Sequence, residues 1–275
     1  MYCEHFGFSE KPFNVTPDPR FLYLTNGHRE ALASILYGIG ERRGFITIIG
    51  EVGTGKTTLL NAAIDRLDEK TKWAHIFNTN LPYGHILVMI LDELNLLKPT
   101  GKLTQFTALR RLNNFAIQQA AKGGNVVIIV DEAQNLSDTA IENLRLLSNL
   151  EDRRNKLIQI VLAGQPELEA KLSRHHMRQF VQRISLKRKI ATMDKKDTYA
   201  YVNHRLDLVN YEGPKLFKRS ALRQIWKFSQ GTPRKINILC DNALLIAFGM
   251  NSRVVKKSVV KEAIKDLNGN GFHRN

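Results

Sequence analysis

The stretch that most constrains the fold runs from Phe45 to Thr58 and reads FITIIGEVGTGKTT. Its first five residues are apolar or β-branched, which is typical of a strand buried on both faces of a parallel sheet. At Gly50 the pattern G-x-x-x-x-G-K-[ST] begins, and it is matched without exception. The following LLNAAIDRL predicts a helix whose N-terminus faces the same loop. A chance glycine-rich turn would lack this flanking strand and helix, so the stretch predicts a nucleoside triphosphate site.

The loop residues have separate chemical tasks in such a site. Glycines let the backbone coil tightly and bring its N–H groups close to phosphate oxygens. Lys56 adds a mobile positive charge for the β- and γ-phosphates, and the Thr57 hydroxyl is a ligand for Mg²⁺. The residues expected to hold ATP are Gly50, Glu51, Val52, Gly53, Thr54, Gly55, Lys56, Thr57 and Thr58.

A second apolar run, 126–130, ends in Asp131 and Glu132. Asp131 is expected to hold Mg²⁺ and Glu132 to polarise an attacking water. Alone, this pattern also describes a strand capped by two solvated acids, but beside a phosphate loop it predicts hydrolysis. Gln165 follows the next strand run, where it would reach the γ-phosphate and orient water; the alternative is a turn residue before Pro166.

Strand patterns alternate with helical patterns as far as Ala191. This predicts a three-layer α/β fold, in which helices cover both faces of a parallel sheet. The strands are expected at 45–49, 73–77, 126–130 and 157–162, and the helices at 28–43, 83–96, 106–122 and after Ser137. Beyond Ala191 only helical patterns occur, at about 195–209, 218–228, 236–249 and 256–266. The expected domains are 1–191, with 1–27 packed on it as an N-terminal strip, and a helical lid at 192–268, followed by a flexible tail at 269–275.

The charge balance points to a polyanionic partner. The chain holds 41 Lys+Arg against 26 Asp+Glu, a net charge of +15, and +9 of this lies within 192–275. Nucleic acid and an acidic membrane surface both fit, as does a solvated basic surface without a partner. Cys3 and Cys240 have neither metal-ligand nor disulfide-framework spacing. With no apolar run of about 18 residues and no signal-peptide pattern, the sequence favours a cytoplasmic location.

Several arginines are candidates for contact with the nucleotide. The segment 172–189 is rich in Arg and Lys, and one of its arginines could act across a subunit boundary on transition-state charge. Arg234 follows Pro233 at the start of a predicted helix, from which it could reach the phosphates.

Taken together and in this order, the motifs resemble the AAA+ ATPases, and more narrowly the general secretion pathway protein A (ExeA-type) family. The resemblance covers nearly the whole chain. The segments that carry it are YCEHFGFSEKPFNVTPDPRFLYLT, GEVGTGKTTLL, VVIIVDEAQNLS, LRLLSNLE, IVLAGQPEL, MRQFVQRI and GTPRKINILCDNALLIA.

The resemblance implies a role for each motif. Residues 50–58 would be Walker A, Asp131 and Glu132 Walker B, and Gln165 sensor 1. Arg183 is the implied arginine finger with Arg178 as second choice, and Arg234 is the implied sensor 2. The segment with Phe13 and Pro17 resembles the family's N-terminal strip near the adenine.

The resemblance leaves two classes of function open. Secretion members of this type continue into a membrane span and a peptidoglycan-binding domain, which this chain does not show. It is similar to short members associated with pilus or exopolysaccharide loci or with DNA transposition (TnsC, TniB and MuB types). One expectation is an ATPase that forms a homo-oligomeric ring or filament on duplex DNA; the other is an ATPase of an envelope machine with protein partners only. A scaffold without turnover is a third, against which Glu132 argues.

Overall fold

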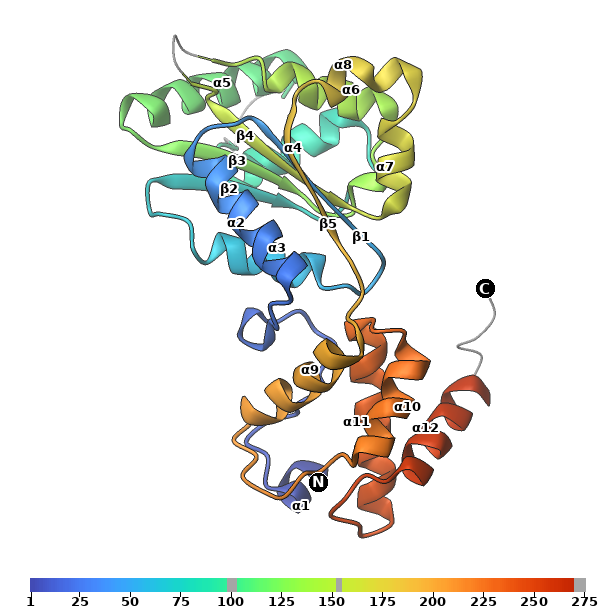
Figure 1. Cartoon of the computed structure of the whole chain (residues 1–275). Coiled ribbons are helices and arrows are strands. Elements are labelled where there is room, and N and C mark those ends of the chain that lie inside the picture. Colours follow the sequence, from blue (N-terminus) through green and yellow to red (C-terminus); the bar gives the residue numbers. More distant parts are fainter. Residues whose placement is uncertain (98–102, 152–154, 270–275) are drawn as a thin grey trace. The chain divides into compact units, whose positions relative to one another are not determined.

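The computed structural model describes residues 1–97, 103–151 and 155–269 (Figure 1). Its contacts divide the chain into two units. The sheet unit comprises Asn26–Val52 and Lys56–Ile190, and the helical unit comprises Met1–Thr25, Gly53–Gly55 and Ala191–Asn275. The predicted flexible tail lies, from residue 270 onward, outside the described residues.

The sheet unit contains five parallel strands in the order β2-β3-β4-β1-β5. Their bounds are β1 Phe45–Gly50, β2 Thr71–Ile76, β3 Asn125–Val130, β4 Ile158–Gly164 and β5 Ile184–Ile190. Every residue of β1, β3 and β4 is buried, because helices cover both faces of the sheet at these inner positions. The all-parallel order places the ends of β1, β3 and β4 side by side.

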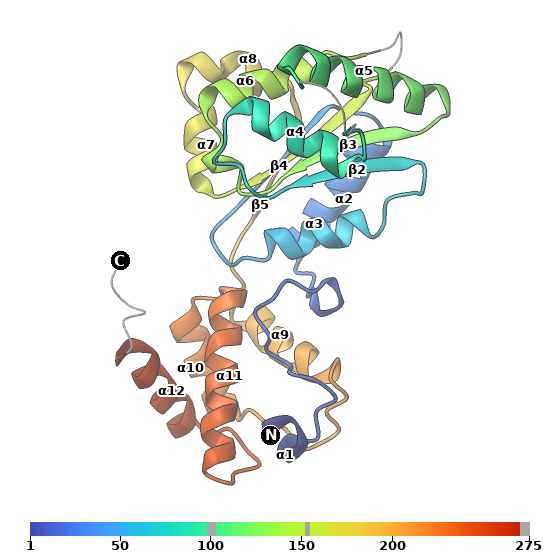
Figure 2. The same cartoon turned by 180° about the vertical axis from the view of Figure 1, so that it is seen from behind.

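Helices lie on both faces of the sheet, as Figures 1 and 2 show. Helices α2 (Asn26–Gly40) and α3 (Lys56–Ile64) cover one face, and α4 (Tyr83–Glu93), α5 (Gln105–Ala121) and α6 (Asp138–Leu147) cover the other. Two shorter helices, α7 (Pro166–Leu172) and α8 (Arg178–Val181), precede β5. This arrangement confirms the predicted three-layer α/β fold.

Strand β5 is a correction to the sequence analysis, which expected no strand within the basic segment 172–189. Along β5 the side chains alternate between exposed and more buried, with Ser185, Lys187 and Lys189 exposed. Strand β5 is an edge strand that pairs only with β1, and the row of its side chains that faces solvent carries Lys187 and Lys189.

The helical unit contains α1 (Tyr2–Phe6), α9 (Lys195–Asp207), α10 (Arg219–Ser229), α11 (Pro233–Gly249) and α12 (Lys257–Gly269). None of the described helices is long and apolar enough to cross a membrane. The expectation that 1–27 packs on the sheet domain is corrected, because Met1–Thr25 clusters with the helical unit. Its aromatic side chains complete a core that the four longer helices share, with Phe13 lying edge-to-face on Phe217 at 5.9 Å between ring centroids.

A buried arginine fixes the N-terminal segment to α9. Arg205 is 5% exposed, and its guanidinium donates to the carbonyl oxygens of Pro12 (2.5 Å) and Asn14 (3.2 Å) and to the Tyr201 hydroxyl (2.9 Å). It also stacks over the Phe21 ring at 4.4 Å. A buried guanidinium that satisfies several of its donors in this way holds the irregular segment in one conformation.

Candidate functional site

The glycine-rich loop leaves the carboxyl end of β1 and leads directly into α3. Gly53 and Gly55 have φ values of 76° and 95°, in the left-handed region that glycine adopts most readily. Lys56, the first residue of α3, is 5% exposed, and its Nζ donates to the carbonyl oxygens of Gly50 (2.8 Å) and Glu51 (3.1 Å). Burial lowers the pKa of Lys56, while the carboxylates of Glu132 and Asp131 act in the opposite direction.

The strand order brings the second motif to this loop. Because β4 lies between β1 and β3, the residues that follow these strands gather at one edge of the sheet. The Thr57 hydroxyl donates to Oδ2 of Asp131 at 2.5 Å, and Asp131 is 2% exposed. A hydroxyl and a carboxylate are the hard oxygen ligands that Mg²⁺ prefers, so these two residues fit the ion.

Glu132 stands beside this pair with its carboxylate held by two amides. Its Oε2 accepts hydrogen bonds from Nε2 of Gln134 (2.5 Å) and from Nε2 of Gln165 (2.9 Å). Its backbone φ is 51°, an uncommon conformation for a residue other than glycine. Burial would raise the pKa of Glu132, but the two amide hydrogen bonds and the Lys56 charge outweigh it, so the pKa is lowered. The side chain is therefore an ionised hydrogen-bond acceptor at neutral pH.

Three residues at this edge were not singled out from the sequence. Gln134 donates to Glu132 and accepts the backbone N–H of Gln165 at 3.1 Å through its Oε1. The Thr79 hydroxyl donates to the Glu132 carbonyl oxygen at 2.8 Å. His75 is 5% exposed, its Nε2 has no partner among the described residues, and burial lowers its pKa while the Asp131 charge opposes this. The sequence gave little sign of these three residues. Thr79 lies in a turn-prone stretch after the second predicted strand, and Gln134 lies two residues after Glu132.

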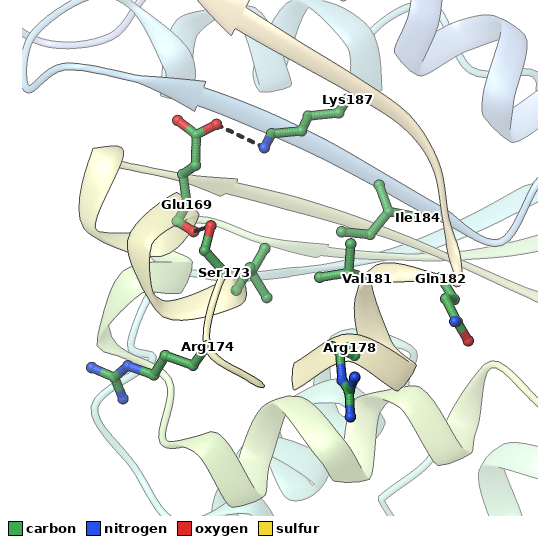
Figure 3. A pocket seen from close by; sticks show the side chains of 9 residues that line it. Glu169, Ser173, Arg174, Arg178, Val181, Gln182, Ile184 and Lys187 are labelled. Carbon is green, nitrogen blue, oxygen red and sulfur yellow. Dashed lines mark hydrogen bonds and ion pairs between the residues drawn. The ribbon is translucent and has the colours of Figure 1, made fainter. Parts of the chain in front are cut away.

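The two candidate finger arginines lie at the other end of the sheet. Phe45, the first residue of β1, pairs with Ile184, so Arg183 precedes the start of β5 while the phosphate loop follows the end of β1. At about 3.3 Å per residue, the length of β5 separates Arg183 from the loop of its own chain. Arg178 begins α8, at the rim of a cavity of about 440 Å³, with its guanidinium turned away from the Glu169–Lys187 ion pair (Figure 3). Both arginines are exposed.

The remaining predicted residues belong to the helical unit. Arg234 is the second residue of α11, after Pro233, and is exposed. Phe13 is 1% exposed, so its ring serves the core of that unit and leaves no face on which a base could stack. Pro17 is exposed and lines a cavity of about 280 Å³ beside Arg20 and Arg205.

Comparisons with known proteins show which family and which fold this chain resembles. A family model described as an AAA domain matches residues 39–172. General secretion pathway protein A of Aeromonas hydrophila is 38% identical over 98% of this chain, and the chain spans about half, 49%, of that protein's length.

Among solved structures, the Aeropyrum pernix ORC2 protein in ADPNP and ADP complexes has a TM-score of 0.69 at 20% identity. That match covers 94% of this chain and 72% of the other. The Aeropyrum pernix ORC1 protein in complex with DNA has a TM-score of 0.71 at 14% identity, covering 94% and 69%. At these identities the two structures show a shared fold.

Proposed function

We propose that this chain, which belongs to the AAA+ ATPases of the type represented by general secretion pathway protein A, binds ATP with Mg²⁺ and hydrolyses it to switch between two states. The observation that carries this proposal is the convergence of Lys56, Thr57, Asp131 and Glu132 at one edge of the sheet.

Each residue has a distinct task in this reaction. The loop N–H groups and Lys56 bind the phosphates, and Thr57 and Asp131 would hold the metal. Bound Mg²⁺ would neutralise charge on the β- and γ-phosphates. Glu132 orients the attacking water and accepts its proton, while Gln165, placed by β4 between the other two strand ends, would donate to the γ-phosphate or the water.

The experiment that tests the proposal compares two variants with the wild type. Glu132→Gln keeps the shape of the side chain but removes the base, so we expect ATP to bind and turnover to fall by about 10²-fold or more. Lys56→Ala removes the cation at the loop, so we expect ATP binding itself to be lost. Titration with a fluorescent ATP analogue and phosphate release measure the two quantities. Undiminished hydrolysis by the folded Glu132→Gln protein would refute the assignment.

The partner of the switch is proposed from the relative. The name of that relative associates it with secretion, and the identity of 38% supports an ATPase that acts on proteins of an envelope machine. Homo-oligomers, as rings or filaments, would bring the arginine of one subunit to the nucleotide of the next.

A second candidate function, ATP-dependent binding of duplex DNA, is favoured by the charge of +15, of which +9 lies within 192–275. A gel shift with and without ATP separates the two candidates. Contacts with DNA phosphates require that log affinity falls linearly with log salt concentration, with a slope of about −0.9 per phosphate contacted. If the mobility shift of the DNA is the same with and without ATP, ATP-dependent DNA binding is refuted and the envelope-machine ATPase with protein partners remains.

A further inference from the structure

Gln134 is a half-buried residue to which neither the sequence motifs nor the proposed function gives a task. It lies in the short 3-10 turn Ala133–Asn135, which directly follows Glu132 at the end of β3. Its side chain meets two other residues of the candidate site, Glu132 and Gln165, which come from different strand ends. The three residues form a closed ring of hydrogen bonds. Gln165 takes part in it twice, with its backbone N–H donating to Gln134 and its side-chain amide donating to Glu132.

The ring admits only one orientation of the Gln134 amide. Its NH₂ group must face the Glu132 carboxylate, because an ionised carboxylate can only accept. Its oxygen must then face the backbone N–H of Gln165, which can only donate. A rotated amide would place oxygen against oxygen and hydrogen against hydrogen. The amide therefore has both of its ends fixed by the chemistry of its neighbours.

The main chain around Gln134 is held just as firmly. Nζ of Lys171, on α7, donates to the carbonyl oxygen of Gln134 at 2.8 Å and to that of Leu136. Gly164, the last residue of β4, lies so close that a Cβ added there would be 3.0 Å from Oε1 of Gln134. Glycine at this position lets the Gln134 amide approach the end of β4. The contacts with Lys171 and Gly164 therefore hold Gln134 in place without a bound ligand.

Both amides bond to the same oxygen of Glu132. Gln134 and Gln165 each donate to Oε2, at 2.5 and 2.9 Å, and this leaves Oε1 as the oxygen that can accept from a water. Two donors on one oxygen define the plane and the rotation of the carboxylate, which a single donor does not. A general base contributes to rate only when its accepting oxygen is aimed at the proton it removes.

We propose that Gln134 is a positioning residue for ATP hydrolysis, which holds Oε2 of Glu132 together with Gln165 so that Oε1 points to the attacking water. This inference rests on the proposed function. Gln134 also accepts a hydrogen bond from the backbone N–H of Gln165, the proposed γ-phosphate sensor. A movement of Gln165 would therefore be passed on to the Glu132 carboxylate through Gln134.

The test replaces Gln134 with methionine, which has a similar length and volume but no amide. We expect kcat to fall roughly 10- to 100-fold, the scale of a lost hydrogen bond to a charged group. The affinity for ATP is expected to stay close to wild type, because Gln134 contacts no described residue of the phosphate loop. A small loss of melting temperature is expected from the unpaired N–H of Gln165. Asn135→Met, at the exposed neighbouring position of the same turn, is the matched control and should keep full activity. Equal kcat in Gln134→Met and Asn135→Met would overturn the inference.

A double variant separates positioning from a general structural role. If Gln134 acts through the Glu132 carboxylate, Gln134→Met should not reduce the residual turnover of Glu132→Gln any further. Additive losses would mean that Gln134 acts elsewhere and would refute the proposal. Gln134→Glu is a second variant of the same shape, and it should lose at least as much turnover because it sets a second carboxylate against the first.

The same measurements distinguish a failure of this inference from a failure of the proposed function. Wild type that hydrolyses ATP, with Glu132→Gln inactive and Gln134→Met fully active, would refute the inference and keep the proposed function. Glu132→Gln with full activity would refute the proposed function.

Discussion

At the scale of single residues, the candidate site joins side chains of two kinds. Lys56, Thr57, Asp131 and Glu132 belong to motifs whose spacing alone predicts their chemistry, and they do lie together at one edge of the sheet. Gln134 and Thr79 make contacts that depend on where a turn directs a side chain. Residue spacing does not encode that direction when the preceding Glu132 has a positive φ. For this reason the sequence could predict that these four residues lie together, but it could not predict the contacts of Gln134 and Thr79.

Arg183 is expected to act on the nucleotide of a neighbouring subunit. Its place before β5, away from the phosphate loop of its own chain, motivates this expectation. Arg183→Ala should bind ATP with near-normal affinity, and its turnover should fall by about 10³–10⁵-fold, the scale of arginine fingers in other nucleotide hydrolases.

Mixing the inactive Arg183→Ala and Glu132→Gln proteins checks the expectation, because some interfaces then combine an intact arginine with an intact base. Arg178→Ala is the comparison variant. Specific activity that stays constant upon dilution to monomer would contradict action in trans.

Arg205 should contribute more to stability than any exposed arginine of the helical unit. Arg205→Met leaves the carbonyl groups of Pro12 and Asn14 without their donor and removes the stacking on Phe21, so we expect a loss of about 2–4 kcal/mol. Arg20→Met is the matched control on the same segment. It breaks the ion pairs with Asp18 and Glu10, but its side chain is 65% exposed, and solvent screens such pairs so that they contribute little to stability. Urea unfolding followed by circular dichroism compares the two, and equal losses would contradict the role of Arg205.

At the scale of elements, hydrophobic periodicity predicted the inner strands and failed where charge or irregularity masked it. Strands β1 and β3 are apolar except for Thr47 and Asn125, so their sequences favour buried strands. Strand β5 alternates Lys187 and Lys189 with partly buried residues, and its charge hid the period of two. The aromatic N-terminal segment has no period at all. That it packs on the helical unit follows from contacts such as Phe13 on Phe217, which no local pattern specifies.

The packing of α2 against the sheet gives a prediction at this scale. A Cβ added to Gly38 would lie 2.6 Å from Cδ1 of Ile46 and 2.9 Å from Cδ1 of Leu186. Gly38→Ala should therefore destabilise the sheet unit by about 1–3 kcal/mol, despite the better helix propensity of alanine.

Gly84→Ala, in α4, is the matched control, because its Cβ would meet no atom within 4 Å. It should stabilise the protein by up to about 1 kcal/mol. Thermal unfolding of both variants decides, and a stabilising Gly38→Ala would show that α2 packs less closely than described.

At the scale of the whole molecule, the sequence predicted two units but assigned the N-terminal segment to the wrong one. Residues of the first 25 positions and of α9–α12 share one core, and the Tyr2 hydroxyl donates to Oδ1 of Asp241 at 2.5 Å. Local sequence patterns do not specify that two distant parts of the chain pack into one unit.

The nucleotide is expected to control assembly through Arg234. A ligand shifts a conformational equilibrium only by its differential affinity for the two states, and an arginine that contacts the γ-phosphate in one state supplies it. We expect a coupling of about 1–3 kcal/mol, so that assembly is favoured roughly 5- to 150-fold by ATP over ADP.

Arg234→Ala should remove this preference while the protein stays folded. Mass photometry with ADP and with a non-hydrolysable ATP analogue measures the assembly state. Identical assembly of the wild type with both nucleotides would contradict the switch.

The strand order also has a consequence for the synthesis of the chain. Strand β1 is paired on both sides, yet Ile160 and Ile184, the partners of its first residue Phe45, follow it by more than a hundred residues. At the usual rate of about 5–20 residues per second, a ribosome reaches β4 roughly 5–25 s after it has made β1. During that time the apolar segment FITII has no strand to pair with, and it is a candidate for capture by chaperones or for aggregation. The strand that anchors the phosphate loop is therefore among the first to be made and among the last to be completed in the sheet.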